Sequence, residues 1–221
     1  MTAVHAAGAA LTGPSAAHTG TPLPAHAETP VPAQAEASVP ALVSAAASAG
    51  LHVLAAAQWP EVGDGAAPPP VPGFVGSSFS PLAAEVARRC LERVGGAQLP
   101  MTAVLVASAL GDLAGAVRVA EGVDGGARLG PLLFFQAVPN AVAGLVASRW
   151  GLTGPVVCVG DTAGALAVAA LLLADGDAEA ALLLRVDQAY VPGGVDRAAA
   201  VLLGPEPAGD GSLPHQEGVR P

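Results

Sequence analysis

An uninterrupted run of twelve apolar residues, from Ala163 to Ala174, constrains the fold of this chain more than any other feature. The run is shorter than the stretch of about 18 residues that a membrane-spanning helix needs. It therefore predicts a buried helix that is apolar on every side, and such a helix has to lie between layers of a larger fold. Asp175 and the residues after it end the run.

Short apolar or β-branched runs alternate with helical patterns along the middle of the chain. Strands are predicted over 51–57, 101–110, 155–159, 180–186 and 198–203, and helices over 81–94, 139–150 and the apolar run, with a shorter helical segment up to residue 122. Ser80 and Pro81 are expected to begin the first helix, because Ser is a good N-cap and Pro fits the first turn. The alternation predicts an α/β fold, a layered sheet with helices on both faces.

Composition divides the chain into three parts. Residues 1–48 are expected to be a disordered, low-complexity Ala/Pro-rich arm, since proline recurs there and interrupts any helix. Residues 49–208 form the predicted domain, and residues 209–221 form a polar tail. The arm holds three of the five His residues, His5, His18 and His26, but their irregular spacing is not that of a metal site.

Charge and cysteine usage exclude several function classes. The net charge is −9 and all nine basic residues are Arg, so a general DNA- or RNA-binding surface is not expected. Cys90 and Cys158 form no CxxC pattern, which favours a reducing compartment. No Lys or Arg precedes Arg88, so a signal peptide is not expected. We expect a cytoplasmic protein with no membrane contact, no metal and no bound cofactor.

The stretch from residue 131 to 155, PLLFFQAVPNAVAGLVASRWGLTGP, carries a more specific pattern. A Pro-Asn pair begins a predicted helix that has an Ala-Gly step, and a Gly-Leu-x-Gly-Pro turn follows it. This order resembles the β-ketoacyl synthases of fatty-acid and polyketide assembly, members of the thiolase-like superfamily. The matching residues are Pro139, Asn140, Ala143, Gly144, Gly151, Leu152, Gly154 and Pro155. We expect Gly144 to permit close packing, and the later glycines to give the turn its backbone freedom.

The resemblance extends more loosely over residues 50–208, including Phe79-Ser80-Pro81 and the closing segment AAAVLLGPEP. It implies the N-terminal half of a thiolase-like fold. In that family this half carries the nucleophile and most of the dimer interface. The family's two catalytic His residues lie in the second half, beyond the part that this chain matches.

The family's nucleophile is a Cys at the start of the buried helix, and this chain departs from that pattern. Counting from the Gly-Pro turn places Ala163 there, and pairing Asp161-Thr162-Ala163 with the family's Asp-Thr-Ala-Cys signature places Gly164 there. Neither residue can act as a nucleophile. Cys158 lies five residues before Ala163, within a valine-rich predicted strand, and is expected to be a buried, inert thiol. Asp161 and Thr162 could form a site pair, but an Asp or Thr between a strand and a helix is expected first of all to cap the helix.

Other polar residues have plain structural interpretations. Arg88, Arg89 and Arg93 could contact the phosphate of an acyl carrier's prosthetic arm, but a solvated helix face is the favoured interpretation. His52 is expected to be a strand residue rather than a base. Asp187 follows a predicted buried strand, where it could hold backbone N–H groups or serve a ligand.

The preferred hypothesis is a non-catalytic, chain-length-factor-like accessory subunit of polyketide or fatty-acid biosynthesis. It would associate with a thiolase-fold ketosynthase subunit or with itself as a dimer, through its buried helix and the neighbouring strand, and could contact an acyl carrier protein. One alternative is a β-ketoacyl synthase acting on acyl thioesters through Cys158, or with a complementing partner chain. Another is a degenerate half-domain without activity.

Overall fold

The computed structural model describes residues 37–95, 99–190 and 193–205, and their strands form one mixed sheet. The strand order is β1-β5-β4-β2-β3. β2 is parallel to β3 and β4, whereas β5 is antiparallel to β1 and β4. The strands are β1 (Leu51–Trp59), β2 (Thr102–Ala107), β3 (Val156–Val159), β4 (Ala180–Asp187) and β5 (Arg197–Pro205).

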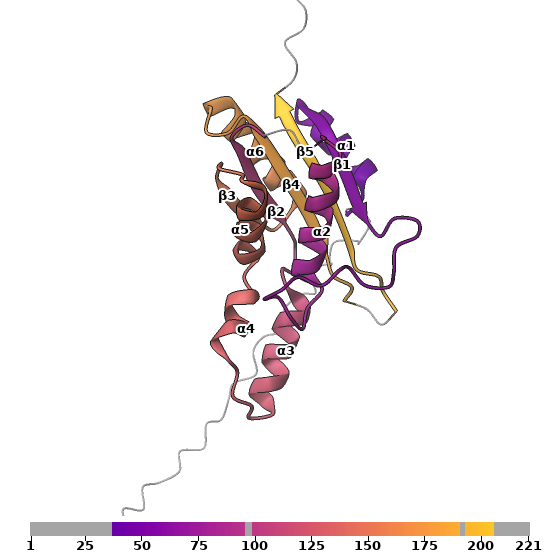
Figure 1. Ribbon diagram of the computed structural model, residues 1–221, viewed down its shortest axis with the longest axis vertical. Helices are drawn as coiled ribbons and strands as arrows, with labels where there is room; N and C mark the ends of the chain where they lie inside the picture. The colour runs from indigo at the N-terminus through magenta and orange to yellow at the C-terminus, as the bar shows by residue number, and fades with distance from the viewer. Residues whose placement is uncertain (1–36, 96–98, 191–192, 206–221) are drawn as a thin grey trace, which may run out of the picture. The chain divides into compact units, whose positions relative to one another are not determined.

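Helices cover both faces of this sheet (Figure 1). α2 (Phe79–Glu92) and α5 (Pro139–Trp150) pack on one face, and α1 (Val39–Ser48) and α6 (Thr162–Asp175) pack on the other. α3 (Leu113–Asp124) and α4 (Pro131–Gln136) extend beyond the end of the sheet.

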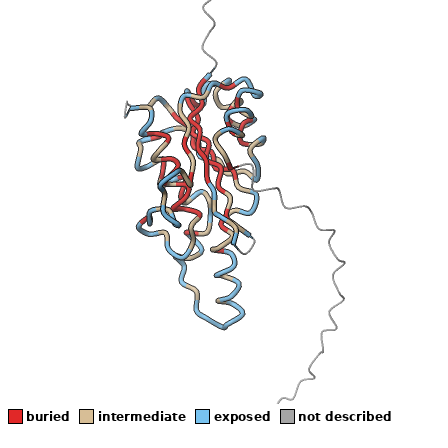
Figure 2. Tube along the Cα trace, turned by 90° about the vertical axis from the view of Figure 1, so that its right-hand side faces the viewer, coloured by how far each residue is buried: buried red, intermediate tan, exposed pale blue. Residues whose placement is uncertain are grey.

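The core consists of two apolar layers that share the strands as a wall. Because side chains alternate along a strand, Val104 and Val106 of β2 face α2 and α5, while Ala103 and Leu105 face α1 and α6. Every residue of β2 is buried. Figure 2 shows the buried residues concentrated in the central strands, with exposed residues on the helices around them.

Most of the predicted elements are present. α5 spans the residues predicted for it, and α6 begins at the start of the apolar run. α2 begins earlier than expected, with Ser78 as its N-cap residue, so the prediction that Ser80 caps this helix is wrong. The Ser77 hydroxyl instead accepts a hydrogen bond from the Phe79 N–H, at 3.1 Å. α4 has no counterpart among the predicted elements.

The predicted arm needs a correction at its C-terminal end, because residues 39–48 form α1. Ser38 is the N-cap residue, and its hydroxyl accepts a hydrogen bond from the Ala41 N–H. Pro40 lies in the first turn, where proline does not interrupt a helix. Leu42 and Ala46, one turn apart, are fully buried against the sheet. The remaining predictions for the arm, residues 1–36, and for the tail, residues 209–221, lie outside the described residues.

α6 is not buried on every side, contrary to the expectation from its sequence. Only Ala165, Leu166 and Ala169 are buried, and 58% of Leu171 is exposed. Ala163, Ala167 and Leu171, four residues apart along α6, are exposed. Each described helix is too short or too polar to cross a lipid bilayer.

Candidate functional site

The start of α6 is the position at which the sequence places the family's nucleophile. β3 leads through Gly160 to Asp161, the N-cap residue of the helix. The Asp161 carboxylate accepts a hydrogen bond from the Gly164 N–H at 2.7 Å, so the expected capping role is confirmed. The next side chains are the hydroxyl of Thr162 and the exposed methyl group of Ala163. The first turn of α6 therefore offers no thiol.

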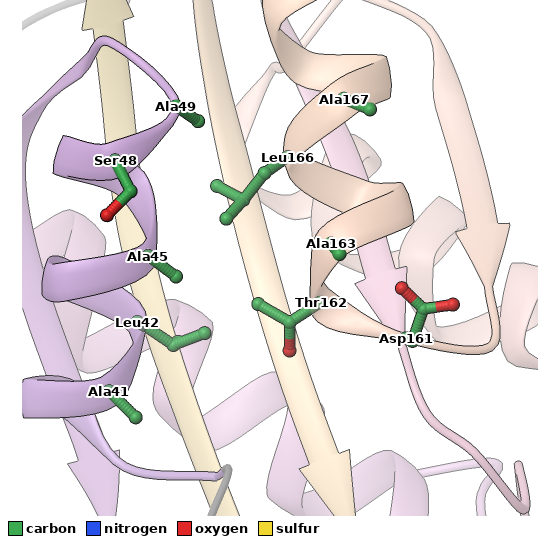
Figure 3. A pocket seen from close by; sticks show the side chains of 10 residues that line it. All are labelled: Ala41, Leu42, Ala45, Ser48, Ala49, Asp161, Thr162, Ala163, Leu166 and Ala167. Atoms are coloured by element: carbon green, nitrogen blue, oxygen red, sulfur yellow. The ribbon is translucent and has the colours of Figure 1, made fainter.

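A groove lies between α6 and α1, beside this helix start. Its volume is about 700 Å³. Figure 3 shows small side chains along both helices, with Thr162 directed into the groove at one end and Asp161 beside it. The Thr162 hydroxyl oxygen is buried and has no hydrogen-bond partner among the described residues. The lining residues are Ala41, Leu42, Ala45, Ser48, Ala49, Asp161, Thr162, Ala163, Leu166 and Ala167.

The two cysteines of the chain lie away from this position. Cys158 on β3 packs against the layer that holds α2 and α5, whereas its neighbours Val157 and Val159 face α6. Burial raises the pKa of the Cys158 thiol. Burial raises the pKa of Cys90 to about 12. Cys90 is buried, but Cys158 is only partly buried, so the expectation of a fully buried Cys158 is wrong. The raised pKa values keep both thiols protonated at neutral pH.

The three motif glycines, Gly144, Gly151 and Gly154, differ in whether the structure requires a glycine at their position. Gly151 ends α5 in the left-handed conformation, with φ of 65°. A Cβ atom at Gly154 would lie 2.6 Å from the Ala103 nitrogen and from the Thr102 carbonyl carbon, so the backbone of β2 excludes any side chain there. A Cβ atom at Gly144 would meet nothing within 4 Å, so the expected close packing at Gly144 is wrong within the described residues.

The arginine cluster of α2 is neutralised by carboxylates. Arg89 pairs with Asp64 and with Glu85, each at 2.7 Å, and its guanidinium lies 4.8 Å from the centre of the Trp59 ring. Arg88 pairs with Glu85 at 2.7 Å and with Glu92 at 2.5 Å. These hydrogen bonds lower the pKa of Glu85, with the bond from Arg88 the largest cause. The carboxylates occupy donors that a phosphate would need.

The structure also shows the positions of three further candidate residues, Arg93, His52 and Asp187. Arg93 pairs with Glu61 at 2.8 Å. His52 is exposed on β1, the strand at the opposite edge of the sheet from β3. Asp187 pairs with the buried Arg185 at 2.8 Å. The structure brings none of the three to the start of α6.

A buried polar cluster that the sequence did not suggest connects the end of β4 to the starts of α2 and α3. The Gln188 amide donates to the hydroxyls of Ser77 and Ser78, at 3.2 and 2.8 Å, and accepts from the Ala114 N–H at 3.1 Å. The two hydroxyls donate in turn to Asp112 and Asp196. In the sequence, the only signal for this cluster is the presence of polar residues, the Ser77-Ser78 pair and Gln188. The polar groups of the cluster are hydrogen-bonded to one another, so the cluster holds the end of β4 against the starts of α2 and α3.

Two regions on either side of α5, the edge strand β3 and the helix α4, expose apolar side chains. β3 lies at the edge of the sheet, and 39% of Val156 is exposed. On α4, the side chains of Leu132, Phe134 and Phe135 are between 53% and 62% exposed. α5 packs against both β3 and α4. Exposed apolar groups of this size commonly mark an interaction site. Val156 lies at the first residue of β3, which follows α5, whereas α4 precedes α5, so the two groups lie toward opposite ends of α5. We refer to these four residues together as the β3–α4 patch.

No three His, Cys, Asp or Glu side chains come close enough to hold a metal ion within the segments that the structure describes. Asp161 caps α6, and Asp64, Glu85 and Asp187 pair with arginines.

A family model and several solved structures match part of this chain. The family model described as "Beta-ketoacyl synthase, N-terminal domain" matches residues 77–203. Among solved structures, the ishigamide ketosynthase/chain length factor has a TM-score of 0.51 and 19% sequence identity, covering 63% of this chain and 46% of that one. A ketosynthase in complex with its chain length factor from Xenorhabdus doucetiae has a TM-score of 0.49 and 19% identity, covering 59% of this chain and 58% of that one. The matched part is thus about half of each solved chain. No curated protein sequence matches this chain.

Proposed function

This chain belongs to the β-ketoacyl synthase family, and from that premise we propose that it is a non-catalytic, chain-length-factor-like accessory subunit of polyketide or fatty-acid biosynthesis. It acts in the cytoplasm, by association with a thiolase-fold ketosynthase subunit. The single observation that carries the proposal is the pair Ala163 and Gly164 at the start of α6, where the family resemblance requires a cysteine.

Acyl transfer through a covalent intermediate needs a nucleophile, a base that activates it and donors that stabilise the oxyanion. The start of α6 can supply backbone N–H groups, but one of them, that of Gly164, already donates to Asp161. The Thr162 hydroxyl has no hydrogen-bond partner among the described residues, so no base activates it. These observations support a role in which another chain performs the chemistry.

The β3–α4 patch supports association as that role. An uncharged edge strand exposes N–H and C=O groups that a partner strand can pair with, and natural proteins commonly protect such edges with charged residues. The strand Val156–Val159 carries no charged residue. Two of the four phenylalanines of the chain lie exposed on α4. A ketosynthase subunit that continues the sheet at β3 and covers α4 would bury both features.

The test is a binding measurement between this purified chain and the catalytic ketosynthase of the same organism, by size-exclusion chromatography with light scattering. We expect a complex of defined stoichiometry. Val156→Asp and Phe135→Asp should weaken it by at least about tenfold, since each places a charge in the patch.

Val62→Asp is the matched control, because Val62 is fully exposed in the loop after β1 and lies outside the patch. It should leave the complex unchanged. Absence of any complex with wild type, or equal loss with all three variants, would contradict the proposal. An aggregating wild-type chain that binds no ketosynthase would favour the degenerate half-domain instead.

A further inference from the structure

α4 carries Leu132, Phe134 and Phe135 of the β3–α4 patch, and it buries only one of its own residues. The helix has six residues, of which Gln136 alone is buried. A buried glutamine needs hydrogen-bond partners, because burying its amide without them is unfavourable. The partner of Gln136 therefore bears directly on where α4 lies.

The partner of Gln136 lies in the loop between β1 and α2. The Gln136 side-chain oxygen accepts a hydrogen bond from the Val75 N–H at 3.1 Å. Phe74 and Val75 line one small cavity together with Leu133 and Gln136 of α4. Phe74 also packs against the core layer that contains α2. We call residues 60–76 the strap, because different helices hold its two ends.

The other end of the strap is fixed by two arginines of α2. Arg89 donates two hydrogen bonds to the Asp64 carboxylate, at 2.7 and 2.8 Å. Arg93 donates two to the Glu61 carboxylate, at 2.8 and 3.1 Å. The Arg89 and Asp64 side chains are only 14% and 15% exposed, and the guanidinium lies over the Trp59 ring. A two-point ion pair that is largely shielded from water is stronger than an exposed one.

The segment between these two ends is stiff. Proline occupies positions 68, 69, 70 and 72, and its ring fixes the φ angle. Val71, among these prolines, is buried, and its carbonyl accepts a hydrogen bond from the Phe74 N–H at 3.0 Å. Proline-rich segments act as semi-rigid spacers rather than as flexible chains. Such a segment transmits a displacement of one end to the other.

We propose that the Arg89–Asp64 pair is a clasp that fixes the position of α4 through the strap and Gln136, and so controls how tightly this chain binds its partner. The control of binding rests on the proposed role of the β3–α4 patch, whereas the positioning of α4 does not. When the clasp is broken, the Val75 N–H moves away from Gln136 and the buried amide loses its partner. The exposed apolar side chains of α4 then no longer form a surface of fixed shape. Asp64 and Gln136 are thus positioning residues.

The test is limited proteolysis with chymotrypsin, which cleaves after phenylalanine where the chain opens locally, with the rate at each site followed by mass spectrometry. Asp64→Ala removes the clasp, and cleavage after Phe134 and Phe135 should become at least about tenfold faster. Gln136→Leu removes the hydrogen bond at the other end and should give a similar rise. Cleavage after Phe79, which is buried in α2, reports global unfolding and should stay slow in both variants.

Glu92→Ala is the matched control, because Glu92 pairs with Arg88 of the same helix and has no hydrogen bond to the described strap. Its cleavage rates should equal those of wild type. The double variant Asp64→Ala/Gln136→Leu should be cleaved no faster than the faster single variant, because both changes interrupt one route. Wild-type rates in Asp64→Ala, an equal rise in Glu92→Ala, or multiplied effects in the double variant would overturn the proposal.

Ketosynthase binding is measured separately, so that failure of either proposal can be recognised. Asp64→Ala should weaken the complex by about tenfold, and Glu92→Ala should not weaken it. If the wild-type chain binds no ketosynthase, the accessory role fails, while the cleavage rates still decide whether the clasp positions α4. If Asp64→Ala is cleaved faster but binds as tightly as wild type, control of binding by the clasp is refuted.

Discussion

Gly154 provides a quantitative test of how the family motif positions the candidate site. Replacing it by Ala places a Cβ atom 2.6 Å from the Ala103 nitrogen, 2.6 Å from the Thr102 carbonyl carbon and 2.7 Å from the Thr102 oxygen. Thr102 and Ala103 are fully buried in β2, so their backbone cannot move aside without disturbing the sheet. The Gly154 N–H also donates to the Thr102 oxygen, at 3.0 Å. Overpacking of this kind costs roughly 1–3 kcal/mol.

We therefore expect Gly154→Ala to lower the free energy of unfolding by about 3 kcal/mol, the upper end of that range, because three backbone atoms are involved. The assay is urea unfolding followed by far-UV circular dichroism, with linear extrapolation to water. A loss of this size is a large share of the roughly 5–15 kcal/mol that stabilises a typical domain.

Two other glycines of the motif are matched controls. Gly151→Ala should cost about 1 kcal/mol, because the residue adopts φ of 65° but has space for a Cβ atom. Gly144→Ala should stabilise the protein by roughly 0.5–1 kcal/mol, because Gly144 is exposed within α5 and its Cβ would meet nothing. If Gly154→Ala were as stable as wild type, or Gly144→Ala the most damaging of the three, the geometric reasoning would be refuted.

Three further predictions concern caps, charges and thiols. Asp161→Ala should lower the free energy of unfolding by about 1 kcal/mol in urea, through loss of the α6 cap. Hydrogen bonding, from Arg88 above all, lowers the pKa of Glu85 in the folded protein. The stabilisation that the ionised Glu85 gives to the fold is therefore complete at neutral pH and is lost as the pH falls through its folded pKa. The stability difference between wild type and Glu85→Gln should thus be largest near pH 7 and should shrink towards pH 3 in thermal melts; a constant difference would contradict this. With Ellman's reagent at pH 8, native Cys90 should not react and Cys158 should react more slowly than in urea, since burial raises both pKa values; rapid native reaction of either thiol would be inconsistent with the structure.

Patterns that depend on local sequence predicted their elements well. Pro139 at the start and Gly151 after the end define α5, because each residue has a strong conformational preference at a helix terminus. Asp161 was predictable as a cap for the same reason. The apolar run gave the position of α6, but it wrongly predicted burial on every side, since Leu171 is 58% exposed.

Features that depend on tertiary contacts were missed or misread. Pro40 was interpreted as a helix breaker, although proline in a first turn is compatible with the helix that Leu42 and Ala46 anchor against the sheet. The pairing of Gln188 with Ser77 joins residues that are 111 positions apart, and no local pattern encodes such a contact. The predicted packing role of Gly144 also required a neighbour that the described residues do not supply.

The most direct test of the central claim is intact-mass spectrometry of the purified protein after incubation with an acyl thioester, comparing wild type with Cys158→Ala. A catalytic ketosynthase treated in parallel serves as the positive control for acylation. The non-catalytic account predicts no added mass on either form of this chain while the control acquires one acyl group. A mass increase on wild type that disappears in Cys158→Ala would contradict the account and would show that this chain is an acyltransferase.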